Sequence, residues 1–470
     1  MTRRLILAAA MAATLFPCGR LAAAYRSALI SRPEARRHGL SRAWYTQIQL
    51  DQARGRVRHL VLHQGTLFVQ TDRAMLHAID AETGQTLWAL QVGLPNHPSL
   101  VPGVNSNLVA VVNGSYVYVL NRFNGKLLWK TQLDGAPGAG AALSERRAYV
   151  PTVQGLVYSY ELEPAKDPAE ELGLVKKKKS PAEETEAERT ERIEALRLRQ
   201  DYVPPLACQS VGRSLVQPIV TRQGIGREYV AWPTDAGYMF VGLVDERDNR
   251  FTIKYRLETD AGIAAPPTYL PPDPEITGDS GVIYAVSRDG FAHAILEKPG
   301  DALWRFSTGE PIIRPAPVIQ ENVYVSTQPG GMYCLSAKSG AENWWAPGVL
   351  QFIAASKTRI YATDTLQQIR VLDAKTGARL DAIPGTALPI RLMNTETDRL
   401  YLATDTGLIQ CLHEIELTQP IQHGQARKPQ PKKPAVQQET LTQAGKEKPA
   451  GEEKPAGKDA AGQAEDNPFK

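Results

Sequence analysis

Residues 78–88 read AIDAETGQTLW, and residues 119–129 repeat the phrase as VLNRFNGKLLW. The phrase returns as GDALW at 300–304, as CLSAKSGAENW at 334–344 and as VLDAKTG at 371–377. In four copies a glycine stands four residues before a tryptophan. A unit that recurs about every 40 residues is typical of propellers and solenoids, whose units bury their apolar faces only against their neighbours. The sequence therefore predicts one large repeat domain rather than the separate domains that the length alone would suggest.

The repeated unit is built from strands. In each unit a polar turn joins two short runs that are rich in branched and aromatic residues, and neither run is long enough for a helix. Eight such hairpins lie at 67–80, 108–120, 148–160, 228–242, 282–295, 323–335, 360–372 and 400–412. Each is expected to be the middle pair of a four-stranded blade. We predict an all-β fold with a single eight-bladed β-propeller; the alternative is seven blades, if the weak fourth repeat is an insertion.

The two ends of the repeat array are complementary. The eighth hairpin is followed by no outer strand, whereas residues 43–50, AWYTQIQL, form a tryptophan-bearing run ahead of the first complete blade. We therefore predict that this N-terminal strand completes the last blade and closes the ring, which removes the edges that an open stack of sheets would expose.

The repeated residues are interpreted as structural. The glycine supplies a positive φ for the turn between the third and fourth strands, and the Asp or Asn before it bonds the amides of that turn. The tryptophan lies on the outer strand and packs between blades, with a ligand platform as the alternative role. A blade with Asp381 at the tryptophan position is expected to pack less tightly. The structural positions are Trp44, Asp80, Gly84, Trp88, Gly125, Trp129, Gly300, Trp304, Gly340, Trp344, Asp373 and Gly377.

The segments outside the repeats have their own signatures. Residues 1–24 resemble an export signal, with Arg3 and Arg4 before an apolar run and a small-residue cleavage site; a Sec or a twin-arginine route is open. Cys18 lies in a poor lipoprotein box, so a lipid anchor there is not favoured. Residues 25–42 are interpreted as a basic linker and 43–423 as the propeller. A low-complexity insertion at 163–201 interrupts the third blade, and a disordered Lys/Pro/Ala-rich tail covers 424–470.

Charge and cysteine content exclude some classes of function. The formal net charge of +4, from 54 basic and 50 acidic residues, provides no field of the kind that nucleic-acid binding requires. Cys208, Cys334 and Cys411 each lie in an apolar strand-like run and are interpreted as small buried residues. No CxxC or Cys/His cluster has metal-ligand spacing, so no metal, catalytic or cofactor site is assigned.

The repeats resemble those of the pyrroloquinoline-quinone-like (PQQ-like) β-propeller superfamily, whose signature is A-x-D-x-x-T-G-x-x-x-W. Within it, an export signal followed by eight blades and no enzymatic insert is similar to the plan of the BamB family. That resemblance implies a non-catalytic, monomeric scaffold in the periplasm or cell envelope, whose partners are envelope proteins such as the outer-membrane barrel assembly machinery. A solvated linker is the preferred interpretation of the basic residues at 25–42, and a peripheral contact with an anionic membrane is the alternative.

Two other functions stay open at this stage. The superfamily includes PQQ-dependent dehydrogenases, for which Asp235, Asp289, Asp364 and Asp405 would be candidate carboxylates; their recurrence in hairpin turns favours a role in the turns themselves. This chain also lacks the adjacent cysteine pair of those enzymes. The other function is binding of a small ligand or polysaccharide, with Tyr238, Phe291 and Tyr333 as candidate aromatic contacts.

Overall fold

The computed structural model describes residues 29–51, 53–162, 205–221, 228–245, 248–273 and 276–423. The predicted signal segment, the insertion at 163–201 and the tail at 424–470 lie outside these ranges. The chain divides into two compact units, Met1–Ala426 and Arg427–Lys470, and every described element belongs to the first.

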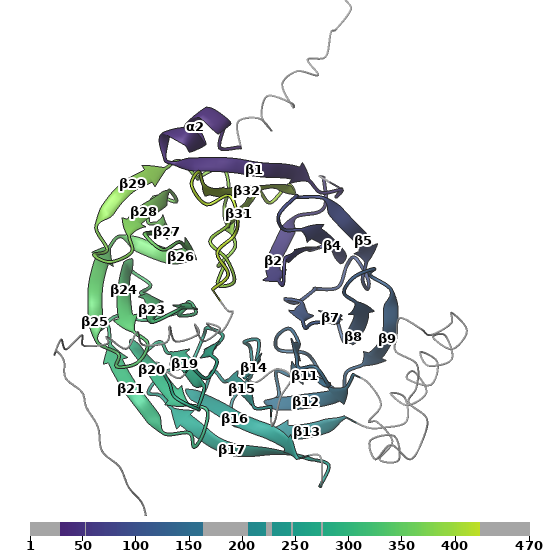
Figure 1. The fold of residues 1–470 in the computed structure, drawn as a ribbon. Helices are drawn as coiled ribbons and strands as arrows, with labels where there is room; N and C mark the ends of the chain where they lie inside the picture. Colours follow the sequence, from purple (N-terminus) through teal and green to yellow (C-terminus); the bar gives the residue numbers. More distant parts are fainter. Residues whose placement is uncertain are drawn as a thin grey trace, which may run out of the picture. The chain divides into compact units, whose positions relative to one another are not determined.

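Eight four-stranded antiparallel sheets form a closed ring, which confirms the predicted eight-bladed propeller (Figure 1). The weak fourth repeat is a complete blade. We number the blades from the first complete one and give the strands of each from the ring axis outward. Blades 1 to 4 are β2 (Val57–His63), β3 (Thr66–Thr71), β4 (Met75–Asp80), β5 (Thr86–Gln91); β6 (Gly103–Val104), β7 (Leu108–Asn113), β8 (Tyr116–Asn121), β9 (Leu127–Gln132); β10 (Ala142–Leu143), β11 (Arg147–Pro151), β12 (Leu156–Glu161), β13 (Leu206–Gln209); and β14 (Ile219–Val220), β15 (Val230–Pro233), β16 (Tyr238–Asp245), β17 (Arg250–Glu258).

The second half of the ring repeats this order. Blades 5 to 8 are β18 (Thr268–Leu270), β19 (Val282–Val286), β20 (Phe291–Leu296), β21 (Ala302–Ser307); β22 (Val318–Ile319), β23 (Asn322–Ser326), β24 (Gly331–Ser336), β25 (Glu342–Pro347); β26 (Val349–Ala355), β27 (Arg359–Asp364), β28 (Ile369–Asp373), β29 (Arg379–Ile383); and β30 (Ile390–Arg391), β31 (Leu400–Ala403), β32 (Leu408–Glu414), β1 (Leu40–Gln47).

The outer strand of blade 8 comes from the N-terminal end of the described chain. β1 pairs with β32 in antiparallel register from Leu40 opposite Glu414 to Gln47 opposite Leu408, with an irregularity between Arg42 and Trp44. The predicted closure by the N-terminal strand is therefore present, and β1 begins three residues earlier than the sequence pattern suggested.

The core of the molecule is divided among the joints between blades. Eight clusters of buried apolar side chains are found among the described residues, and each fills the space between two neighbouring sheets. The middle strands are buried on both faces, as in β3, whereas the outer strand β5 is largely exposed. This gradient explains why the middle hairpins give the clearest apolar signal in the sequence.

A short helix precedes the closing strand. The interpretation of residues 25–42 as a linker missed α2 (Arg32–Arg37), which begins at the N-cap Ser31, whose hydroxyl accepts a hydrogen bond from the Glu34 amide at 3.2 Å. Proline in the first turn suits this position, because its missing N–H would have no partner there. The helix packs Ala35 into the cluster between blades 7 and 8.

Candidate interaction face

The repeated tryptophans lie on outer strands, and four of them bond to the turn of the following blade. Trp88 Nε1 donates a hydrogen bond to the Arg122 carbonyl at 2.8 Å, and a Cβ added to Gly125 would lie 2.7 Å from the Trp88 ring. The same pair of contacts joins Trp44 to Ala81 and Gly84, Trp304 to Ala337 and Gly340, and Trp344 to Ala374 and Gly377. These four glycines have φ between +69° and +74°, so glycine meets a conformational and a steric demand at once.

Asp80 and Asp373 organise their own turns. Oδ1 of Asp80 accepts hydrogen bonds from the amides of Glu82 and Thr83, at 3.1 and 2.8 Å, and from the Thr83 hydroxyl. Oδ1 of Asp373 accepts the equivalent bonds from Lys375 and Thr376. Bonds from the backbone and hydroxyl of Thr376 hold the pKa of Asp373 below its ordinary value.

Four joints depart from this pattern, and at the joint between blades 3 and 4 Leu206 of β13 takes the tryptophan position. Trp129 is 1% exposed, and its Nε1 has no acceptor among the described residues, which stop at 162 where the next turn would follow. Tyr255 takes the tryptophan position ahead of Gly300 and donates from its hydroxyl to the Glu297 carbonyl at 2.9 Å. Asp381 takes the tryptophan position of β29 and pairs with Nδ1 of His38, which follows α2, at 2.6 Å, so this joint carries an ion pair instead.

The four candidate carboxylates are spread over blades 4, 5, 7 and 8. Asp235 pairs with Arg213, whose Nε lies 2.6 Å from Oδ2; burial alone would raise the pKa of Asp235, but the bonds from Arg213 lower it overall. Oδ1 of Asp364 accepts hydrogen bonds from the amides of Leu366 and Gln368. Asp289 bonds the amides of Asp260 and Phe291, and Asp405 pairs with Arg56 at 3.3 Å. These contacts are those of turn residues.

The candidate aromatic residues also lie on separate blades. Arg256 lies over the Tyr238 ring at 5.2 Å, and Arg305 lies over the Phe291 ring at 4.5 Å. Tyr333 meets Phe306 edge-on and Trp345 at a tilt, with ring centroids 5.4 and 6.3 Å apart. Each ring thus has a partner within its own blade or on the neighbouring one, and the structure does not bring the three together.

One face of the ring carries apolar side chains that nothing in the described chain covers. Because neighbouring strands are antiparallel, the turns between second and third strands and the links between blades all lie on this side, which we call the connection face. Four of its large apolar residues are 45–69% exposed: Leu94, Val211, Leu215 and Leu366. Leu94 lies in the link between blades 1 and 2, Val211 and Leu215 lie in the link between blades 3 and 4, and Leu366 lies in the turn between the middle strands of blade 7. The repeat pattern did not single out these residues, because they lie in links and turns of variable sequence.

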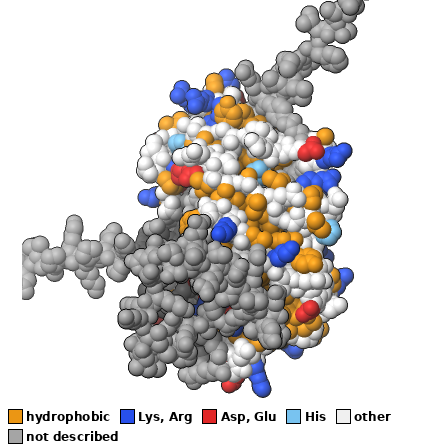
Figure 2. All heavy atoms as spheres, turned by 90° about the vertical axis from the view of Figure 1, so that its right-hand side faces the viewer, with side chains coloured by type: hydrophobic (Ala, Val, Ile, Leu, Met, Phe, Trp, Pro, Cys, Tyr) orange, Lys and Arg blue, Asp and Glu red, His pale blue; other side chains and the backbone are white. Residues whose placement is uncertain are grey.

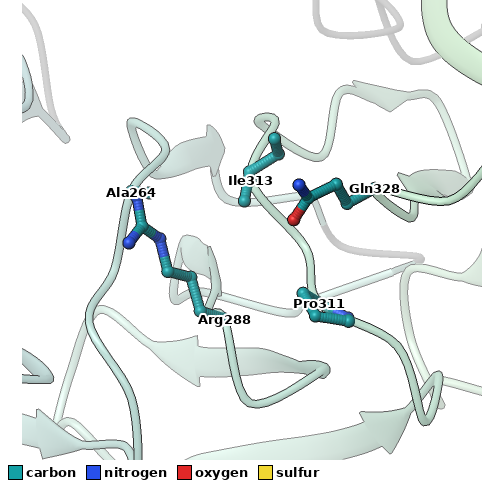
Figure 3. A pocket seen from close by; sticks show the side chains of 5 residues that line it. All are labelled: Ala264, Arg288, Pro311, Ile313 and Gln328. Atoms are coloured by element: carbon teal, nitrogen blue, oxygen red, sulfur yellow. The ribbon is translucent and has the colours of Figure 1, made fainter.

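The same face contains a shallow hollow of about 500 Å³ between blades 5 and 6. Ala264, Arg288, Pro311, Ile313 and Gln328 line it, and Figure 3 shows Arg288 beside Ala264 with Gln328 and Ile313 facing it. The guanidinium of Arg288 makes no hydrogen bond or ion pair with any described residue. The hollow therefore offers a free positive charge and an amide next to apolar surface.

The opposite face holds buried charges at the joint between blades 8 and 1. Glu396 accepts the Gln64 amide at 2.9 Å, and burial raises its pKa to about 7. Burial together with the charge of Arg122 lowers the pKa of His63 to about 4. The fully buried Arg399 pairs with Asp398 and Glu82, and it donates to the carbonyls of Leu417 and Thr418. The segment after β32 is thereby fastened to this face.

Three further properties of the described chain bear on function. No group of three or more His, Cys, Asp and Glu residues is placed to hold a metal ion. Cys208, Cys334 and Cys411 are buried free thiols, and burial raises the pKa of each. Of the helices that the structure describes, none has the length and apolar character needed to cross a bilayer.

Fold and repeat together define an eight-bladed β-propeller of PQQ-like repeats. The family model of the outer membrane protein assembly factor BamB matches residues 37–159 and 279–410, which is more than half of the chain. The chain belongs to this family. No curated protein sequence matches it significantly.

Solved structures agree on the fold. BamB from Moraxella catarrhalis is 12% identical, with a TM-score of 0.54 over 80% of this chain and 97% of that one. The Saccharomyces cerevisiae protein Sqt1 is 11% identical, with a TM-score of 0.56 over 79% and 97%. The computationally designed Ika8 protein is 12% identical, with a TM-score of 0.53 over 77% and 96%. At such identities the likeness concerns the fold alone.

Proposed function

We propose that this protein is an exported, non-catalytic scaffold that holds other proteins of the cell envelope together during outer-membrane protein assembly. The observation that carries the proposal is that the connection face carries four exposed large apolar residues in its links and turns: Leu94, Val211, Leu215 and Leu366. Loops fixed on a rigid ring form a broad surface suited to protein partners. Membership of the BamB family supports the choice of outer-membrane assembly as the process.

The location follows from the same proposal. An export signal at 1–24 would deliver the chain across the cytoplasmic membrane, and a monomeric propeller would then act in the periplasm or at the envelope surface. The partners would be envelope proteins of the barrel assembly machinery. No nucleic acid, cofactor or metal is part of this function.

The test is photo-cross-linking from defined positions in the native cell envelope. A photoreactive residue at Leu366 or Leu215 is expected to capture a protein of the outer-membrane assembly machinery, identified by mass spectrometry. The control is the same residue at Phe123, which is 61% exposed but lies in a turn on the opposite face. Capture of the same protein from all three positions, or recovery of the propeller alone from the soluble exported fraction, would reject the proposal.

A further inference from the structure

The outer strand of blade 1 differs from the other outer strands in charge. β5 reads TLWALQ, whereas every other described outer strand of five or more residues contains at least one charged residue. Natural sheets protect their edges with charged residues or proline, or by keeping the edge strand short, because an unprotected edge pairs with other strands. β13 is also uncharged but has only four residues. β5 is therefore the least protected edge of the described ring.

The backbone of β5 has unused hydrogen-bonding groups. Among the described strands it pairs only with β4, and the Val92 amide donates to the Ala74 carbonyl at the end of this ladder. In an antiparallel pair the bonded residues alternate, so Trp88 and Leu90 bond to β4. The N–H and C=O groups of Ala89 and Gln91 consequently point away from the sheet.

Exposed apolar side chains lie along this free edge. Leu87 is 50% exposed and Leu90 is 38% exposed, and Leu87 is the extra residue of a bulge, between Thr86 opposite Ile79 and Trp88 opposite Ala78. Figure 2 views the flank that carries β5 and β9 in Figure 1, and hydrophobic side chains gather there. A strand added to β5 would thus meet the exposed side chains of Leu87 and Leu90.

We propose that β5 binds an extended, uncharged segment of another polypeptide, which joins blade 1 as a fifth strand. Main-chain bonds to Ala89 and Gln91 would supply affinity, and Leu87 and Leu90 would select apolar side chains. A charged segment would be rejected, since β5 offers no opposite charge. A second copy of the chain is a poorer occupant, because an edge of six residues is small against the surface that a stable dimer buries. This proposal does not depend on the function proposed above.

The test uses the full chain and a dye-labelled, end-blocked hexapeptide of valine, isoleucine and threonine. We expect saturable binding by fluorescence anisotropy, and slower hydrogen exchange at the amides of Ala89 and Gln91 in the complex. A peptide of the same length with two central lysines should not bind. Ala89→Pro should weaken binding about tenfold or more, because it removes an outward N–H and places a ring in the path of the added strand.

Matched variants separate docking from folding. Ala207→Pro changes the equivalent position of β13, and it should leave affinity unchanged. Leu90→Lys should abolish binding, whereas Leu380→Lys, at a position of β29 that is 53% exposed, should not. The proposal is overturned if Ala89→Pro and Leu90→Lys bind like the unmodified chain, or if protection from exchange appears elsewhere. It is equally overturned if the lysine peptide binds as well, or if the chain dimerises through β5 and excludes the peptide.

Discussion

At the scale of single residues, the glycine of the repeat meets two independent demands. A positive φ disfavours any side chain, and the tryptophan of the preceding blade occupies the place of a Cβ. A turn that needed only the backbone conformation would tolerate asparagine at modest cost. The added steric demand explains why glycine recurs at this position in each copy of the phrase.

These two demands can be separated by a pair of variants. Gly377 has a φ of +69°, and an added Cβ would lie 2.5 Å from Trp344; Gly309 has a φ of +70° and nothing within 4 Å of the same point. Both alanine variants should lose about 1 kcal/mol to the backbone. Gly377→Ala should lose a further 1–3 kcal/mol, roughly the usual cost of overpacking. Denaturant midpoints measure the difference, and equal losses would show that the indole contact is unimportant.

Sequence reasoning located these residues but not their partners. The sequence predicts that the tryptophan packs between blades but does not say which residue it meets; the structure pairs Trp88 with Gly125 and Trp44 with Gly84. The offset arises because an outer strand faces the next sheet of the ring. Arg288 and Leu366 could not be found from the pattern, since nothing in the repeat depends on them.

At the scale of elements, the joint between β29 and α2 should respond to pH. Burial alone would lower the pKa of His38, but hydrogen bonds to Asp381 and Glu34 raise it overall, and His38 lowers the pKa of Asp381. Because the histidine pKa is raised in the folded state, its contribution to stability is fully present at pH values below the ordinary histidine pKa. That contribution is lost as the pH rises through the folded-state pKa. Because the carboxyl pKa is lowered in the folded state, its contribution to stability is present at pH values above the ordinary carboxyl pKa and is lost as the pH falls through the folded-state pKa. The pair should therefore contribute most between about pH 4 and 6.5.

His38→Gln tests this expectation. The loss of stability relative to the unmodified chain should be larger at pH 5.5 than at pH 8.5, as measured by denaturant midpoints at both values. His413→Gln is the control. His413 lies in β32, the strand that pairs with β1, and its Nδ1 lies 2.8 Å from the carbonyl of Glu414 rather than from a carboxylate. A loss that is the same at both pH values would contradict the ion-pair interpretation.

The helix before β1 had a usable sequence signal. Ser31 is followed three residues later by Glu34, with a proline between them, which is a helix-start pattern. The surrounding arginines dominated the interpretation as a linker. Six residues are too few for an apolar stripe, so the helix depends on its contact with blades 7 and 8.

At the scale of the whole molecule, the pairing of β1 with β32 can be locked covalently. Ser41 lies opposite His413 in the register. Oxidised Ser41→Cys/His413→Cys should be more stable than its reduced form by about 2–4 kcal/mol, because the bond closes a very long loop. Denaturant midpoints with and without reductant measure this difference in stability. The midpoint of the single variant Ser41→Cys should not depend on reductant. Failure of the two thiols to join would contradict the register.

The ring could be foreseen because its information is repeated. Eight hairpins recur with the same period, so the weak fourth copy can be recognised from the spacing of its neighbours. The strand at Trp44 has no partner in the first blade, and the last blade lacks an outer strand, so the two can be matched. The connection face had no such redundancy. Its exposed residues lie in links and turns whose length and sequence differ from blade to blade. That Leu94 and Leu366 lie on the same face becomes clear only from the three-dimensional structure.

The order in which the strands are made has a kinetic consequence. Among the described strands β1 is synthesised first, whereas β32, the strand that accepts it, is synthesised last. Blade 8 therefore cannot assemble until β32 has been synthesised, however many blades have already formed. Until β32 arrives, the free edge of β1 and the unfilled gap between blades 7 and 1 remain open to chaperones and to proteases. Contacts this distant along the chain are slow to form, so ring closure should be the final and rate-limiting event of folding.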